Sequence, residues 1–158
     1  MHTDLTCCTY PIADLSGLKK KVLNWLRPFS TFCFLDNQQY TTTAHEAECL
    51  VGVGVRRWVQ SDNIRDADAF FGKKGWLFGH LSYSLKASLH GLSNTKQDKV
   101  GFSPYCFFSP QVVLQLKEGS LTIYADDPDL VFQQLSDQPE SEISESLPLF
   151  QASPVLNR

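Results

Sequence analysis

Apolar residues recur at helical spacing near the start of the chain. Lysines occupy the opposite face, as in an amphipathic helix that packs on a core. Asp14 or Ser16 can cap the first turn, and Pro28 blocks any continuation. The repeating positions are Leu15, Leu18, Val22, Trp25 and Leu26.

Two strand-like segments follow this helix. The nearly continuous apolar run Phe29 to Leu35 predicts a strand that is buried on both faces or lies in the middle of a layered structure. Cys49 to Val59 reads as one further strand, with Gly52 and Gly54 between valines. Glycine inside a strand indicates close approach of another backbone. A phosphate-binding G-x-G-x-x-G is not formed, because Arg57 stands where the third glycine belongs.

A short helix is predicted over Asp62 to Phe71, ending at Gly72, with a strand after it. Side chains of this strand alternate between two faces. Trp76, Phe78, His80, Ser82 and Ser84 share one face, and Leu77, Gly79, Leu81, Tyr83 and Leu85 share the other. The second face is the more apolar, so we expect it to be buried. Tyr83 could bind a ligand or lie in the core with its hydroxyl satisfied, and the sequence favours the core.

Two strands, a hairpin and a helix are predicted in the second half. Pro110 separates the strand runs Tyr105 to Phe108 and Val112 to Leu116. Glu118-Gly119 predicts a hairpin turn, and Asp127 followed by Pro128 predicts a helix start. The apolar side of that helix would be Leu130, Val131 and Leu135.

The composition changes at Asp137, where prolines, glutamates and serines become frequent, as in a linker. We therefore expect one domain over residues 1–136 and a linker over residues 137–158. The predicted class is α+β, with a mainly antiparallel sheet and flanking helices.

Composition and charge exclude several classes of protein. Of the 158 residues, 42% are hydrophobic and 12% aromatic, which excludes wholesale disorder. The net charge of −3 argues against nucleic-acid binding, and we interpret Lys19-Lys20-Lys21 as a solvated helix face. No apolar run approaches the roughly 18 residues of a membrane span, and no secretory signal pattern begins the chain. We expect a cytoplasmic protein without membrane contact.

The cysteines and histidines do not form a recognisable site. Five cysteines without C-x-x-C spacing predict no disulfide framework, and the four histidines lack the pairing that zinc needs. His80 shares a face with Ser82 and Ser84. A hydrolytic site would also need a strained nucleophile turn and an orienting acid, and neither is visible.

Four segments together suggest a family. Residues 75–86, G-W-L-F-G-H-L-S-Y-S-L-K, resemble the G-Y-L-S-Y-D-L-K strand of component I of para-aminobenzoate (aminodeoxychorismate) synthase, a relative of anthranilate synthase component I. Leu35-Asp36-Asn37 is similar to the family's Leu-x-Ser turn, and residues 48–54, E-C-L-V-G-V-G, to its next strand. Residues 102–110, F-S-P-Y-C-F-F-S-P, resemble F-P-x-x-x-F-F-x-P. The resemblance runs from about Phe32 to Leu135 in the family's order, although His80, Ser84 and Asn37 replace Tyr, Asp and Ser.

The resemblance implies the N-terminal part of the layered anthranilate synthase component I-like fold. Enzymes of this family convert chorismate and ammonia, with Mg²⁺, to 4-amino-4-deoxychorismate for folate synthesis. Their catalytic residues lie in a C-terminal chorismate-binding domain, to which residues 137–158 would lead, and a glutamine amidotransferase subunit supplies the ammonia. No catalytic residue therefore maps onto this chain, which we expect to be no enzyme by itself. The residues agree, since no carboxylate set with Lys or His suits metal-assisted displacement of a hydroxyl.

Several members of the family bind tryptophan in the N-terminal region. The positions that correspond to that pocket are Leu35, Asn37, Ala44 and His45. Asn37 in place of Ser keeps hydrogen-bonding capacity but adds volume. By themselves, Asp36-Asn37 favour an Asx-type turn over a ligand pocket.

Other interpretations remain open at this point. The same domain of an anthranilate synthase component I, in the tryptophan pathway, is hardly separable by these motifs. A free-standing small-ligand or interaction module, without any role in chorismate chemistry, is the second alternative. Because Phe29 to Leu35 and Tyr105 to Phe108 are apolar on both faces, we also expect an exposed apolar surface and a homodimer. Local helices that covered both faces would instead leave a monomer.

Overall fold

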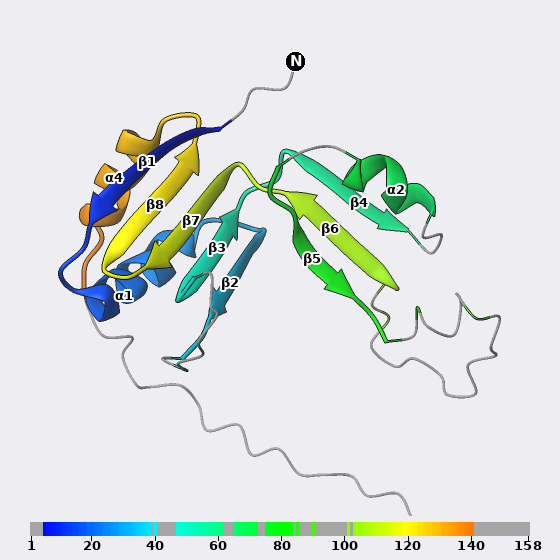
Figure 1. The fold of residues 1–158 in the computed structure, drawn as a ribbon, viewed down its shortest axis with the longest axis horizontal. Helices are drawn as coiled ribbons and strands as arrows, with labels where there is room; N and C mark the ends of the chain where they lie inside the picture. Colours follow the sequence, from blue (N-terminus) through cyan, green and yellow to red (C-terminus); the bar gives the residue numbers. More distant parts are fainter. Residues whose placement is uncertain are drawn as a thin grey trace, which may run out of the picture.

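The computed structural model has an α+β fold, which confirms the predicted class, but its antiparallel strands form two sheets and not the single sheet that was expected (Figure 1). It describes residues 5–38, 40, 47–61, 65–72, 75–83, 85, 90, 101 and 103–140, except the side chains of residues 67 and 69. The five-stranded sheet contains, in spatial order, β1 (Thr6–Pro11), β8 (Ser120–Ala125), β7 (Val112–Lys117), β3 (Cys49–Val53) and β2 (Phe32–Asp36). The three-stranded sheet contains β4 (Arg57–Ser61), β6 (Tyr105–Ser109) and β5 (Phe78–Leu81).

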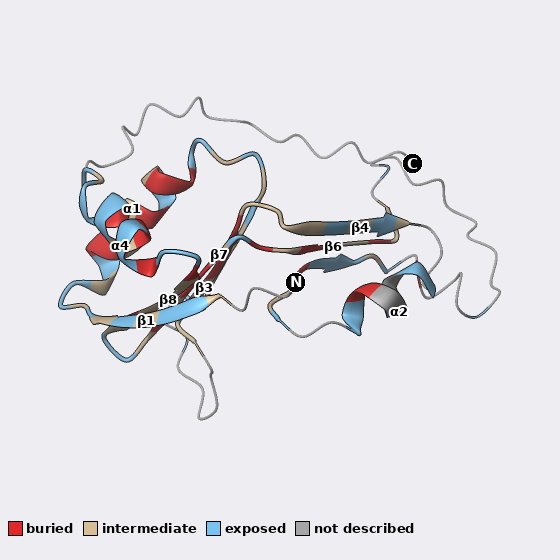
Figure 2. Cartoon of the chain, turned by 90° about the horizontal axis from the view of Figure 1, so that it is seen from above, coloured by how far each residue is buried: buried red, intermediate tan, exposed pale blue. Residues whose placement is uncertain are grey.

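Two amphipathic helices, α1 (Leu15–Leu26) and α4 (Pro128–Ser136), cover one face of the five-stranded sheet (Figure 2). Asp14 Oδ1 accepts a hydrogen bond from the Gly17 N–H at 3.0 Å, and Asp127 Oδ1 accepts one from the Leu130 N–H at 3.0 Å. Both aspartates therefore act as N-caps. The Asp127 cap was predicted, and of the two candidates for α1, Asp14 is the cap and not Ser16. The core beneath the helices includes Val22, Leu26, Val51, Leu114, Leu116, Leu121, Ile123 and Leu135.

A second, smaller core joins the two sheets. Phe78 and Phe108 of the three-stranded sheet pack with Val113 of β7. The ring of Phe78 lies over Gly52, where an added Cβ would come within 2.5 Å of it. Gly52 therefore makes room for a side chain, and not for another backbone as its sequence context suggested.

The chain passes between the two sheets at two points where the sequence suggested simpler connections. Cys49 to Val59 was expected to be one strand, but it is divided between β3 and β4 at Gly54, whose φ is +69°. This left-handed conformation favours glycine and turns the chain into the second sheet. Pro110 marks the return from β6 to β7 (Figure 1). The hairpin between β7 and β8 lies at Glu118 and Gly119, as predicted.

β2 contradicts the prediction of a strand that is buried on both faces or centrally placed. It begins at Phe32, lies at the edge of its sheet, and leaves Phe32 46% and Leu35 53% exposed. Apolar side chains indicate that the faces of a strand favour burial, but they do not determine how many strands pair with it.

β5 is buried on the opposite face from the one predicted. Phe78 is buried and Trp76 packs beside it, whereas Leu81 is 60% and Tyr83 86% exposed. The expectation that Tyr83 lies in the core was therefore wrong. Contact with the five-stranded sheet buries the Phe78 face, and α2 (Arg65–Phe71) lies on the other side of β6, with Phe71 against Phe107 at 4.9 Å between ring centroids.

Two features near the termini were not foreseen. β1, whose sequence T-C-C-T-Y-P lacks apolar alternation, pairs with β8 along its whole length. The lysine run is also less solvated than expected, because Lys19 pairs with Asp36 at 2.7 Å and Lys21 with Glu140 at 3.4 Å.

The predicted linker lies outside the described residues from position 141 onward. Among the helices that are described, none is long and apolar enough to cross a membrane.

Candidate functional site

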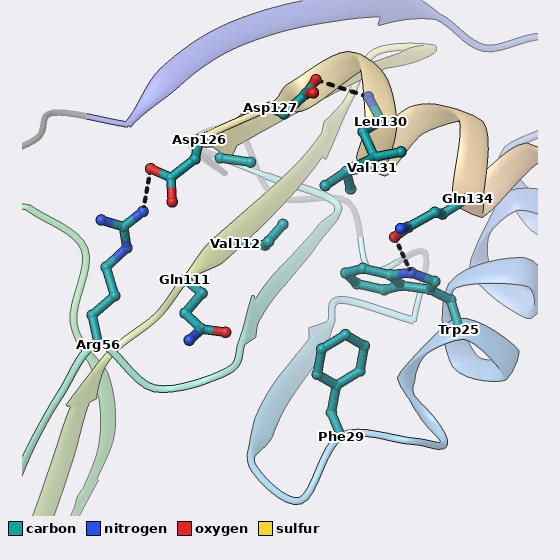
Figure 3. Close-up of a pocket in the computed structure, with 11 residues that line it drawn as sticks. Trp25, Phe29, Arg56, Gln111, Val112, Asp126, Asp127, Leu130, Val131 and Gln134 are labelled. Carbon is teal, nitrogen blue, oxygen red and sulfur yellow. Dashed lines mark hydrogen bonds and ion pairs between the residues drawn. The ribbon is translucent and has the colours of Figure 1, made fainter.

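A pocket of about 460 Å³ lies where α1 ends, α4 begins and the chain leaves β8 (Figure 3). Its walls come from five separate segments, including the connections between β3 and β4 and between β6 and β7. The lining residues are Trp25, Phe29, Arg56, Gln111, Val112, Ala125, Asp126, Asp127, Leu130, Val131 and Gln134.

The polar side chains of this pocket are held by contacts with one another and with the backbone. A guanidinium nitrogen of Arg56 donates to Asp126 Oδ1, which joins the β3–β4 connection to the end of β8. The Nε of Arg56 is buried and has no hydrogen-bond partner among the described residues. Gln111 Nε2 donates to the Val55 carbonyl at 3.4 Å. The pocket therefore has ordered polar groups on one side.

The apolar part of the pocket is built on Trp25. Its Nε1 donates to Gln134 Oε1 at 3.2 Å, which orients the indole, and the ring of Phe29 lies 4.9 Å away between centroids. Aromatic walls beside a few fixed polar groups are typical of sites for small amphipathic molecules.

Charge limits which molecules suit this pocket. The lining contains one cationic side chain, Arg56, and two anionic ones, Asp126 and Asp127. The excess of negative charge disfavours a dicarboxylate such as chorismate. The described lining also lacks a nucleophile paired with a base. The described lining therefore offers no evident catalytic chemistry.

None of these lining residues was predicted as a site. They come from stretches far apart in the sequence. In its own stretch, each residue already has a structural role on a helix face, in a cap or in a turn. Only the Asp127-Pro128 helix start was a signal, and it marks a cap as readily as a ligand site.

The predicted tryptophan-type pocket lies elsewhere. Leu35 is on the sheet face that points away from α1 and α4, beside Leu50. The N–H of Asn37 donates to the Glu48 carbonyl at 3.0 Å, and its Nδ2 donates to the Tyr40 carbonyl at 3.5 Å. Ala44 and His45 lie outside the described residues. The site therefore stays a prediction, and it shares no residue with the pocket in Figure 3.

The Asx-type turn considered for Asp36-Asn37 is present. Asp36 Oδ1 accepts from the Gln38 N–H at 3.2 Å and also from Lys19 Nζ at 2.7 Å. Gln38 has a φ of 53°, in the left-handed region. The turn therefore depends on Asp36 and, through it, on α1.

The cysteines are free thiols, and three of them have raised pKa values. Burial raises the pKa of Cys49 to about 12; the Asp36 carboxylate adds to this, and Lys19 opposes it. Burial also raises the pKa of Cys33 and Cys106. Cys106 is paired in register with His80, whose Nε2 lies 3.3 Å from the Ser103 carbonyl oxygen. A thiol with a raised pKa is a poor nucleophile, so this cysteine and histidine do not make a catalytic pair.

No protein-family model matches this chain, and no curated protein matches it either. A functional assignment therefore depends on the four sequence motifs and on the surfaces that the fold exposes.

Proposed function

We propose that this chain is the non-catalytic N-terminal domain of a para-aminobenzoate synthase component I-like enzyme. The observation that carries this proposal is where the four motifs fall in the fold. The Leu35-Asp36-Asn37 turn ends β2 and residues 48–54 contain its neighbour β3, while residues 75–86 and 102–110 contain the adjacent strands β5 and β6. Motifs that are separate in the sequence thus form two pairs of hydrogen-bonded strands.

The proposal includes partners that supply the chemistry. The parent enzyme would convert chorismate and ammonia to 4-amino-4-deoxychorismate with Mg²⁺ held by its C-terminal chorismate-binding domain, and a glutamine amidotransferase subunit would deliver the ammonia. This chain would complete the layered fold. The same domain of an anthranilate synthase component I is an alternative that the motifs do not separate.

Exposed apolar side chains support an incomplete layered structure. Phe32, Leu35, Trp58 and Leu81 lie on strands and are 46 to 60% exposed. Large apolar side chains that stay exposed on strands favour packing against a further partner. A C-terminal domain that packs against these sheets would remove them from water.

We expect that the chain alone does not consume chorismate. Incubation with chorismate, ammonia and Mg²⁺ should give no product above a buffer control, because the described residues offer no acid/base group beside a metal site. Addition of the chain to a separately produced C-terminal half of a para-aminobenzoate synthase component I should raise its rate of aminodeoxychorismate formation. Sustained turnover by the chain alone would contradict the proposal, as would a catalytic half that gains nothing from it.

A free-standing small-ligand module is the second candidate, favoured by the pocket of about 460 Å³. The nucleotide sequence after the Arg158 codon separates the two, since a continuing frame that encodes the catalytic half supports the enzyme and a stop codon supports the module.

Calorimetry with tryptophan tests which site binds a ligand. On the first proposal we expect weak binding that Asn37→Ala or His45→Ala weakens about fivefold, the effect of one lost hydrogen bond. Gln111→Ala is the matched control in the pocket of Figure 3 and should change nothing. Binding that is lost in Gln111→Ala and kept in Asn37→Ala would place the ligand in that pocket instead.

A further inference from the structure

The outer edge of β2 carries backbone groups that no described strand meets. β2 pairs with β3 on one side, and Figure 1 shows its other side at the limit of the sheet. The Gly54 N–H donates to the Thr31 carbonyl and the Asn37 N–H to the Glu48 carbonyl, both at 3.0 Å. In an antiparallel ladder this pattern makes the odd-numbered residues of β2 bond to β3. The N–H and C=O groups of Phe32, Phe34 and Asp36 therefore point outward.

This edge lacks the features that protect most edge strands. Natural edges carry proline, lysine, bulges or inward-pointing charges, which prevent pairing with another chain. β1, at the opposite edge of the same sheet, ends in Pro11, whereas β2 reads F-C-F-L-D. Its one charge, on Asp36, is neutralised by Lys19 at 2.7 Å. β2 therefore carries no proline, lysine or bulge along its outer edge.

We propose that the free edge of β2 pairs antiparallel with β2 of a second copy of this chain, about a two-fold axis at Phe34. The sheet is then continuous through both copies. Phe34 of one copy lies opposite Phe34 of the other, and Phe32 opposite Asp36. All the outward N–H and C=O groups of these residues are hydrogen-bonded in this register.

Side-chain chemistry fits this register. Cys33 lies opposite Leu35 of the other copy, on the sheet face away from α1 and α4, so an exposed leucine gains an apolar neighbour. Like charges never face each other, because Asp36 meets Phe32. Because β2 can pair antiparallel with an identical strand, no different protein is required to cover its edge. Two-fold dimers are also the commonest assembly of soluble proteins. A strand from a different polypeptide is the competing occupant, and it predicts that the isolated chain is monomeric.

The first test measures the association of the purified full chain by light scattering. Phe32→Pro removes an outward N–H without touching the ladder to β3, and Phe32→Ala, the matched control, removes the same ring but keeps the N–H. We expect a concentration-dependent dimer whose dissociation constant is about tenfold higher in Phe32→Pro than in Phe32→Ala, because each copy loses one hydrogen bond. Circular dichroism establishes that both variants are folded.

A second test reports the register directly. Odd-numbered residues of the paired strands form the close, non-hydrogen-bonded pairs, with Cα atoms about 4.5 Å apart, which suits a disulfide. Leu35→Cys, in a Cys7→Ser background, should form a covalent dimer under mild oxidation, and adding Cys33→Ser should abolish it. A chain that stays monomeric at all concentrations overturns the proposal. Equal dissociation constants for the two Phe32 variants, or a covalent dimer that survives Cys33→Ser, do so as well.

Discussion

Replacing Gly52 with alanine is expected to lower the free energy of unfolding by about 2 to 3 kcal/mol, as overpacking of a well-packed core does. The added Cβ would lie 2.5 Å from the ring of Phe78, which is 4% exposed and enclosed by Phe108 and Val113. Any shift of the ring away from Gly52 would disturb its packing with Phe108 and Val113. Urea denaturation of both proteins measures the difference.

Gly72→Ala is the matched control for this change. The nearest atom to an added Cβ there is the Asp68 carbonyl oxygen at 3.5 Å, an ordinary contact, so stability should stay within about 0.5 kcal/mol. Phe78→Leu should cost less in the Gly52→Ala protein than in the unaltered one, because the smaller side chain relieves the overlap. Strictly additive effects would mean that Gly52 and Phe78 do not contact each other.

Lys19→Met should lower the free energy of unfolding by about 2 kcal/mol, the cost of leaving a partly buried charged acceptor without its donor. The side chains of Lys19 and Asp36 are only 17% and 16% exposed, so solvent does not replace the lost contact fully. Asp36 also holds the turn through the Gln38 N–H, which couples the loss to the end of β2. Lys20→Met on the exposed face of the same helix is the control, and an equal cost there would contradict the argument.

The pKa of Cys49 depends on the same Lys19–Asp36 ion pair. Asp36 raises this pKa and Lys19 lowers it, so Lys19→Met should raise it further and Asp36→Asn should lower it. Because the folded pKa of about 12 exceeds the ordinary 9.0, the associated stability is complete below about pH 9 and is lost as pH rises toward 12. Alkylation rates of the thiol against pH measure the shift. Identical profiles in both variants would show that the pair does not act on Cys49.

Elements whose causes are local followed from the sequence. α1 begins after Asp14 and ends at Leu26, and α4 begins at Pro128 after the Asp127 cap. The hairpin at Glu118 and Gly119 was equally evident. Helical periodicity, a capping carboxylate and a two-residue turn all act within a few residues, so the sequence contains their whole explanation.

The arrangement of strands depended on contacts between distant segments. Burial of Phe78 instead of Leu81 follows from the bare surface at Gly52, and the edge position of β2 follows from which strands β3 pairs with. The pocket around Trp25 likewise joins five segments, and the predicted residues Leu35 and Asn37 are not among them. Hydrophobic patterning by itself thus determined the helices, the hairpin and the α+β class. Only tertiary packing decided the exposed edge and the pocket, because pairing partners and buried faces are set by surfaces that come together across the whole chain.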